Sequence, residues 1–583
     1  MKFRFIDLVK NLGIKFLTSV KRFPISILMA FSAVIFVIIL NHNSETFSQS
    51  AIESVIRAAM VLALGFPLFF SVKILFERKP ESNFIIMSGI YSAGIIILVL
   101  YYIFVLAELN SVSATRYSIL TLVLYLVFLF IPMIFKKESF ELFVVKLFVS
   151  FFTVVLYSVI LFGGIAAVIA STVFLFKLTI TERIYADIAA IIFGGIAPVL
   201  FLSYIPEEGK KLSVEEYSKI VKVLFLYIIL PIVSVFAVIF YVYFFTILFK
   251  PWPSNRIFRI AFYFLLTSVV AAFFVYPLRS VSKWAKNFIF IFPKLLLPFI
   301  VLMFMSLVIR IQAYGFTFMR YFLLVASVWL AFALIYLSFF KNAKNIILLI
   351  SLSIFMFLSI AGPWNFASVT KASQSKIFYN ILSKYDMVQN NQIVKSSNEV
   401  SEEDKISLTS IISYYGNHLS FKDLKYLPDN FSYNKMNEVL GFEPAYYRYN
   451  NYGNDFHYFS VMDSNYVINA KYYDYVSVIT YNNQTKVQAA EGDLYVIAEN
   501  NSITIKNKGE TIYTKKIEDI LGQIGSSESM KEGLTQKEMT IHDENENISI
   551  TYLIDNAGYE RNTNSGVVRI NQFKTTILIK LKK

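Results

Sequence analysis

The sequence predicts a polytopic α-helical membrane protein with about 11 transmembrane helices, followed by a C-terminal extracytoplasmic α+β domain with an antiparallel sheet. Three observations support this fold class. Hydrophobic residues make up 56% of the 583 residues. They cluster in runs of about 17–25 residues, which is the length that a helix needs to cross the hydrocarbon core. After residue 364 these runs stop, and short strand-like runs separated by Asn, Gly and Asp begin. The predicted strands are 456–462, 466–470, 473–481, 493–498, 502–507, 510–515, 548–554 and 575–580.

Eleven apolar runs fit a membrane span. The first run lacks a small-residue cleavage site before the polar NHNSET, so we expect a retained anchor and not a cleaved signal peptide. The apolar stretch 147–176 is either one tilted span or a span broken at Gly163-Gly164. The predicted spans are roughly 24–40, 56–76, 84–106, 117–135, 147–170, 184–204, 223–248, 258–278, 293–309, 321–340 and 345–361.

The segments outside the spans complete the domain division. Residues 1–22 mix apolar side chains with six basic residues, which fits a basic amphipathic segment at the membrane surface or, as the alternative, an ordinary basic flank of the first span. The transmembrane helical domain is expected at 23–364 and a helical connector at 365–400. The α+β domain at 401–583 follows. Helices are expected at about 371–385, 404–415 and 433–440, before the strands.

Charge is distributed unevenly between the two parts of the chain. Residues 1–364 carry a net charge of +17 and residues 365–583 carry −3, which gives +14 for the whole chain. A basic membrane part reflects topology and anionic lipid, so we expect the lipid bilayer and not nucleic acid as a partner. With the N-terminus inside, 22 basic residues flank the inner span ends and 9 flank the outer ones. The positive-inside rule therefore predicts a cytoplasmic N-terminus, and an odd number of spans places the C-terminal domain outside.

The stretch RIQAYGFTFMRY at 310–321 interrupts two apolar runs with polar residues. It lies at the predicted outer end of two spans, where glycine permits a tight turn and threonine can cap the next helix. One hypothesis is a site that binds phosphate or carboxylate. The alternative is helix capping and contact with the C-terminal domain. The residues of this candidate outer-face polar cluster are Arg310, Tyr314, Gly315, Thr317 and Arg320.

The pentapeptide FGGIA occurs twice in the predicted membrane domain, with Gly163 and Gly164 in one copy and Gly194 and Gly195 in the other. Small residues let membrane helices approach closely, so these glycines are candidates for helix packing. Broken helices also line the substrate paths of transporters, so a pathway role is the alternative.

No residue pattern predicts catalysis or a cofactor. Cysteine is absent, which excludes disulfides and thiolate chemistry. The four histidines, His42, His418, His457 and His542, show no metal-ligand spacing, and no phosphate-binding Gly-rich loop occurs. We therefore expect no catalytic residue, no metal and no cofactor.

Several motifs together resemble an uncharacterised bacterial family of multi-pass membrane proteins, known as a domain of unknown function (number 4153). They are the 309–321 pattern, FPKLLLPF at 292–299, the Pro251-Trp252-Pro253 turn and GPWNFASVTKASQSKIFYNIL at 362–382. The resemblance implies a bacterial cytoplasmic (inner) membrane location and a many-span fold. It implies no activity and no site residue.

These observations favour a non-enzymatic envelope protein that anchors, assembles or senses, with an outer C-terminal domain that binds an envelope protein partner. Tyrosine-rich stretches at 446–452 and 472–475 suit such a surface. One alternative is a lipid-linked glycosyl or phosphoglycosyl transferase, with Glu45 or Glu53 as its acidic residue. Another is a transporter or lipid flippase that uses the glycine-rich spans.

Overall fold

The chain divides into two compact units, Met1–Pro444 and Ala445–Lys583. The expected start of the α+β domain at residue 401 falls inside the first unit, because the helices around it pack with the membrane helices. The computed structural model describes residues 13–78, 83–134, 140–207, 213–247, 256–340, 343–390, 392–396, 399–428, 430–445, 454–461, 467–482, 487–524, 530–562 and 568–582. The first twelve residues of the amphipathic segment, the Pro251-Trp252-Pro253 turn and the tyrosines of 446–452 lie outside these ranges.

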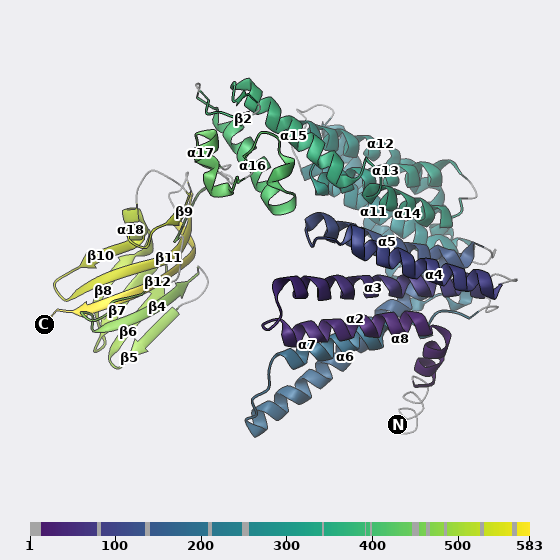
Figure 1. Ribbon diagram of the computed structural model, residues 1–583, viewed down its shortest axis with the longest axis horizontal. Coiled ribbons are helices and arrows are strands. Elements are labelled where there is room, and N and C mark those ends of the chain that lie inside the picture. The colour runs from purple at the N-terminus through teal and green to yellow at the C-terminus, as the bar shows by residue number, and fades with distance from the viewer. Residues whose placement is uncertain are drawn as a thin grey trace. The chain divides into compact units, whose positions relative to one another are not determined.

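Long apolar helices build the first unit (Figure 1). Ten helical segments among the described residues are long and apolar enough to cross a membrane, and an eleventh is shorter. They coincide with the eleven predicted spans. The ten are α2 (Pro24–Asn43), α3 (Gln49–Glu77), α4 with η1 (Phe84–Leu100, Tyr101–Val105), α5 with η2 (Ser111–Phe130, Ile131–Met133), α6 (Phe140–Phe176), α7 with η3 and α8 (Arg183–Ala189, Ala190–Ile196, Ala197–Ser203), α9 with η5 and α10 (Lys219–Lys222, Val223–Ile229, Leu230–Ile247), α11 with η6 (Arg256–Val275, Tyr276–Ser280), α12 (Lys283–Tyr314) and α13 (Phe318–Phe339); the shorter one is α14 (Ile346–Ile360).

Polar side chains at the span ends satisfy backbone groups that an apolar sequence leaves unpaired. Ser48 caps α3 and Asn83 caps α4, and each side chain accepts a hydrogen bond from a backbone N–H of the first turn. Asn110 and Ser113 form a reciprocal capping box at the start of α5. These spans therefore begin where small polar residues give way to an apolar run.

The α6 helix resolves the alternative that the sequence leaves open for 147–176. It is continuous over 37 residues and passes through Gly163-Gly164 without a break. Its last apolar turn is largely exposed, with exposed fractions of 82% for Phe174 and 71% for both Leu175 and Phe176.

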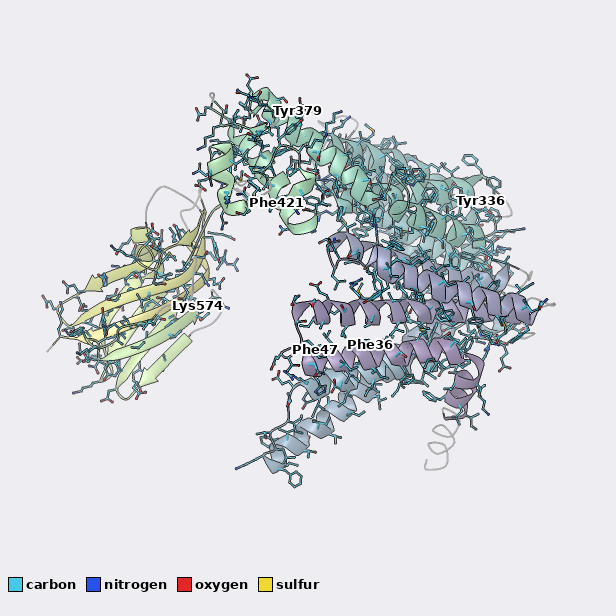
Figure 2. The ribbon with its side chains drawn as sticks, viewed as in Figure 1. Phe36, Phe47, Tyr336, Tyr379, Phe421 and Lys574 are labelled. Atoms are coloured by element: carbon cyan, nitrogen blue, oxygen red, sulfur yellow. The ribbon has the colours of Figure 1, made fainter. Side chains whose placement is uncertain are left out.

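After α14, residues 365–444 form a helical lobe that belongs to the first unit. Its helices are α15 (Phe366–Lys384), α16 (Glu402–His418) and α17 (Met436–Leu440), with a small hairpin of β1 (Val388–Gln389) and β2 (Gln392–Ile393) and the short turns η7 (Phe421–Asp423) and η8 (Tyr433–Lys435). These helices lie at the predicted positions. The lobe has its own core, in which Leu382, Leu408 and Tyr415 are fully buried. Tyr379 of α15 and Phe421 of η7 mark it in Figure 2.

The second unit contains two sheets. A six-stranded sheet has the order β4-β12-β11-β3-β9, with β10 also paired to β11, and a four-stranded meander has the order β5-β6-β7-β8. All pairs are antiparallel except β3 with β9. The strands are β3 (Asn454–Val461), β4 (Tyr475–Tyr481), β5 (Val487–Glu491), β6 (Leu494–Glu499), β7 (Ser502–Asn507), β8 (Glu510–Lys516), β9 (Met530–Leu534), β10 (Thr540–Glu544), β11 (Ile548–Asn562) and β12 (Val568–Leu581), with α18 (Ile517–Leu521) and η9 (Gly522–Ile524) after β8.

Alternation of side chains explains the long central strands. On β11, Ile548, Ile550, Tyr552 and Ile554 are fully buried, because every second residue points to the same face of the sheet. This pattern predicts the strand from sequence. Residues 467–470, which the sequence also suggests as a strand, form none, and Val467 is fully exposed.

Candidate docking site at the 310–321 turn

The turn between α12 and α13 depends on glycine. Gly315 follows the last residue of α12 with φ 66° and ψ −174°, a region that essentially only glycine adopts. Its N–H donates to the carbonyl of Ile311 at 2.8 Å and so closes the helix. Thr317 then caps α13, and its side chain accepts from the backbone N–H of Arg320 at 3.5 Å. Both roles agree with the capping hypothesis.

Helix α15 of the lobe packs directly on this turn. The Gln374 side-chain amide donates to the carbonyls of Tyr314 at 3.0 Å and Phe316 at 2.8 Å. The Ser373 hydroxyl accepts from the backbone N–H of Phe316 at 2.9 Å. Gln374 is only 4% exposed. Two side chains of α15 therefore satisfy three backbone groups of the turn.

Helix α16 supplies a further contact. The Tyr414 hydroxyl accepts from the backbone N–H of Phe318 at 2.8 Å, which is one of the free donors in the first turn of α13. Burial raises the pKa of the Tyr414 hydroxyl above its ordinary value. The two lobe helices are joined to each other as well, because the Tyr415 hydroxyl lies 2.9 Å from that of Ser375.

An aromatic cluster surrounds these hydrogen bonds. The Phe366 ring is fully buried and lies 4.6 Å from the ring of Phe318 in an edge-on arrangement and 5.2 Å from that of Phe322. The Tyr414 ring lies 5.8 Å from that of Phe318. Edge-on aromatic pairs add about 0.5–1.5 kcal/mol beyond the area they bury. The lobe is thus attached to the membrane helices by polar and apolar contacts together.

The two arginines of the predicted cluster behave differently. The Arg320 guanidinium donates to the carbonyls of Tyr314 and Gly315, both at 2.9 Å, and so caps the negative end of α12. Arg310 lies one helical turn before Tyr314, and its Nε is buried without a hydrogen-bond partner among the described residues. The five predicted residues thus cluster, but their polar groups point mainly to backbone and to the lobe.

Sequence reasoning missed the lobe side of this interface, namely Phe366, Ser373, Gln374 and Tyr414. A signal was present, because a glutamine and serines interrupt the apolar face of the predicted 371–385 helix. We call the turn together with these four residues the docking site.

The two FGGIA copies have different surroundings. A Cβ on Gly194 would lie 2.6 Å from the Cγ2 atom of Val34, and one on Gly195 would lie 2.9 Å from the Phe31 ring, so α2 packs closely on η3. At Gly163, as at its neighbour in α6, an added Cβ would meet no atom within 4 Å. The geometry thus gives a packing role to one copy only.

One of the two acidic residues proposed for a transferase, Glu45, is already paired. Glu45 forms an ion pair with Arg183 at the start of α7, next to a 2.6 Å contact between His42 and Asp187. Two cavities stand out among the described residues, one of about 340 Å³ beside Glu108 and Lys371 and one of about 660 Å³ described further below. Neither is lined by Glu45, Glu53 or the paired glycines.

Comparison with known proteins places the membrane part in a family. The family model described as "Domain of unknown function (DUF4153)" matches residues 28–376, which is more than half of the chain. The chain belongs to this family. The match ends inside α15, after Gln374, so the DUF4153 region contains the turn and three of the four lobe residues of the docking site, all except Tyr414.

A curated relative is also of unknown function. The chain is 22% identical over 409 residues to the "Uncharacterized protein PM1469" of Pasteurella multocida (strain Pm70), an alignment that covers 67% of this chain. The chain spans about three-fifths (62%) of the length of that relative. No solved structure matches this DUF4153 chain.

Proposed function

We propose that this chain is a non-enzymatic protein of the bacterial envelope, in which the membrane helices hold an extracytoplasmic C-terminal domain that binds a partner. The docking site is the observation that supports this proposal. Four hydrogen bonds between α15 or α16 and the 314–318 backbone fix the lobe to two neighbouring spans. Such an arrangement holds the lobe itself at a defined place on the membrane helices and needs no catalytic group.

The partner surface that we propose is the outer edge of β4. Val476 and Val478 are 51% and 62% exposed, and the preceding Tyr472 is 68% exposed. Among the described residues β4 pairs on one side only, with β12. An exposed apolar edge strand is where an extended segment of another protein adds to a sheet. We therefore expect a strand from an envelope protein as the partner.

Crosslinking in native membranes, followed by purification and mass spectrometry, tests this function. The full chain is expected to retain one stable envelope partner, and a chain truncated after Pro444 is expected to lose it. Val476→Asp combined with Val478→Asp should reduce recovery at least about tenfold, because two carboxylates disfavour strand pairing. Thr511→Asp with Thr514→Asp places the same charges on exposed positions of the other sheet's edge strand β8 and serves as control. Undiminished recovery by the truncated chain would contradict the proposal.

The proposed orientation has a separate test. With a cytoplasmic N-terminus and eleven crossings, a tag after Lys583 is expected to be digested by protease in intact spheroplasts. A tag at the N-terminus should resist digestion until the cells are lysed. Protection of the C-terminal tag under the same conditions would mean that one of the eleven segments, such as the 15-residue α14, does not cross.

A further inference from the structure

A second feature, far along the spans from the docking site, has the character of a ligand site. A cavity of about 660 Å³ lies where η6 ends, α12 begins and α13 ends. This volume is within the range of small-molecule sites, about 300–1,000 Å³. We call it the basic cavity. Its lining includes Tyr276, Arg279, Lys283, Lys286, Phe290 and Phe340.

The charge of the basic cavity is uncompensated. None of the residues that line it is acidic. Arg279, Lys283 and Lys286 form no ion pair with any described residue, although Arg279 stacks at 3.6 Å over the ring of Tyr276. The nearby carboxylate of Glu141 accepts a hydrogen bond from Asn345 at 2.7 Å and does not line the cavity.

The position of two of these cations violates a rule of helix stability. Lys283 and Lys286 lie in the first turn of α12, which contains no acidic residue. The N-terminus of a helix carries a partial positive charge and is stabilised by anions, whereas cations there are unfavourable. A bound anion would remove this repulsion and use the helix end as part of its site.

The lining also includes two exposed aromatic rings. Phe290 is 42% exposed and Phe340 is 61% exposed, and both lie on membrane-spanning helices or directly at their ends. A small soluble anion would make no favourable contact with these apolar rings. A molecule with a phosphate and acyl chains can place its phosphate among the cations and its chains along the rings. Basic pockets between membrane helices bind lipid headgroups in this way.

We infer that the basic cavity binds the phosphate headgroup of an anionic phospholipid. The cations hold the phosphate, Tyr276 fixes Arg279 through the stacking contact, and the hydroxyl of Tyr276 is itself held by the carbonyl of Ala343 at 2.9 Å. Headgroup binding thus connects η6, the start of α12 and the segment after α13.

Native mass spectrometry tests the inference. The full chain is purified in detergent, mixed with one defined lipid at a time, and released from the detergent in the spectrometer. Phosphatidylglycerol is expected to remain bound and phosphatidylcholine is not. Lys283→Gln combined with Lys286→Gln, which leaves the Arg279 stack intact, should weaken phosphatidylglycerol binding by about 10- to 100-fold. Lys283→Arg with Lys286→Arg should retain it.

The matched control is Lys219→Gln with Lys222→Gln, which removes the same charge from the start of α9. That end lies on the same side of the membrane by the alternation of spans, but these lysines do not line the cavity. An equal loss of binding in the control would show a general charge effect and overturn the inference. Displacement of phosphatidylglycerol by millimolar inorganic phosphate would assign the site to free phosphate instead. Unchanged binding by the glutamine variant would also overturn it.

Discussion

Replacing Gly315 by alanine is expected to release the helical lobe from the membrane helices. The backbone conformation costs a residue with a side chain about 1–3 kcal/mol. The added Cβ would also lie 2.5 Å from the Cδ1 atom of Ile377 and 2.9 Å from polar atoms of Gln374 and Ser373. Overpacking of this kind costs a further 1–3 kcal/mol or so. A total of about 3 kcal/mol raises the population of the opened lobe by about 100-fold.

Hydrogen–deuterium exchange of peptides from α15 and α16 measures this opening in the purified full chain. Gly163→Ala is the matched control, because an added Cβ there meets nothing within 4 Å. Exchange in α15 should rise in the Gly315 variant and stay at the wild-type level in the control. Equal exchange in all three proteins would mean that the turn does not hold the lobe.

Replacing Phe366 by alanine is expected to have a similar or larger effect. The side chain is fully buried between two rings of α13, and deletion of a buried phenylalanine costs about 3–5 kcal/mol. We expect faster proteolysis of the lobe and a lower temperature of thermal unfolding. Phe174→Ala removes the same group from an 82% exposed position of α6 and should leave lobe proteolysis unchanged.

A double-mutant cycle then isolates the ring contact. Phe318→Ala and Phe366→Ala together should destabilise the lobe by less than the sum of their separate effects, with a coupling of about 0.5–1.5 kcal/mol. Strict additivity would show that Phe366 acts only through its own burial and not through the ring of α13.

The features that could be predicted from sequence are those that a short segment determines by itself. A run of about 20 apolar residues specifies a span regardless of its neighbours, which is why all eleven runs correspond to helices. Gly315 and Thr317 have recognisable residue types for a turn and a cap. The alternating pattern of β11 specifies a strand in the same way.

The features that could not be predicted depend on distant partners. Ser373 and Tyr414 contact backbone groups 57 and 96 residues away, and no local pattern gives such a pairing. The paired glycines are a second example. The two copies of FGGIA have the same sequence, but only the copy with Gly194 and Gly195 packs against another helix. Strands β5, β9 and β10 were missed because their short, polar sequences become strands only beside their partners.

The length of α6 has a consequence for the lipid around it. At 1.5 Å per residue a helix of this size extends about 55 Å, nearly twice the hydrocarbon thickness of about 30 Å. Even a tilt of 40° leaves it spanning about 42 Å. Phe174, Leu175 and Phe176 at its far end would then meet headgroups and water unless the bilayer thickens around them or another apolar surface covers them. Because of hydrophobic mismatch, the tilt and depth of α6 in the membrane therefore depend on the thickness of the surrounding bilayer.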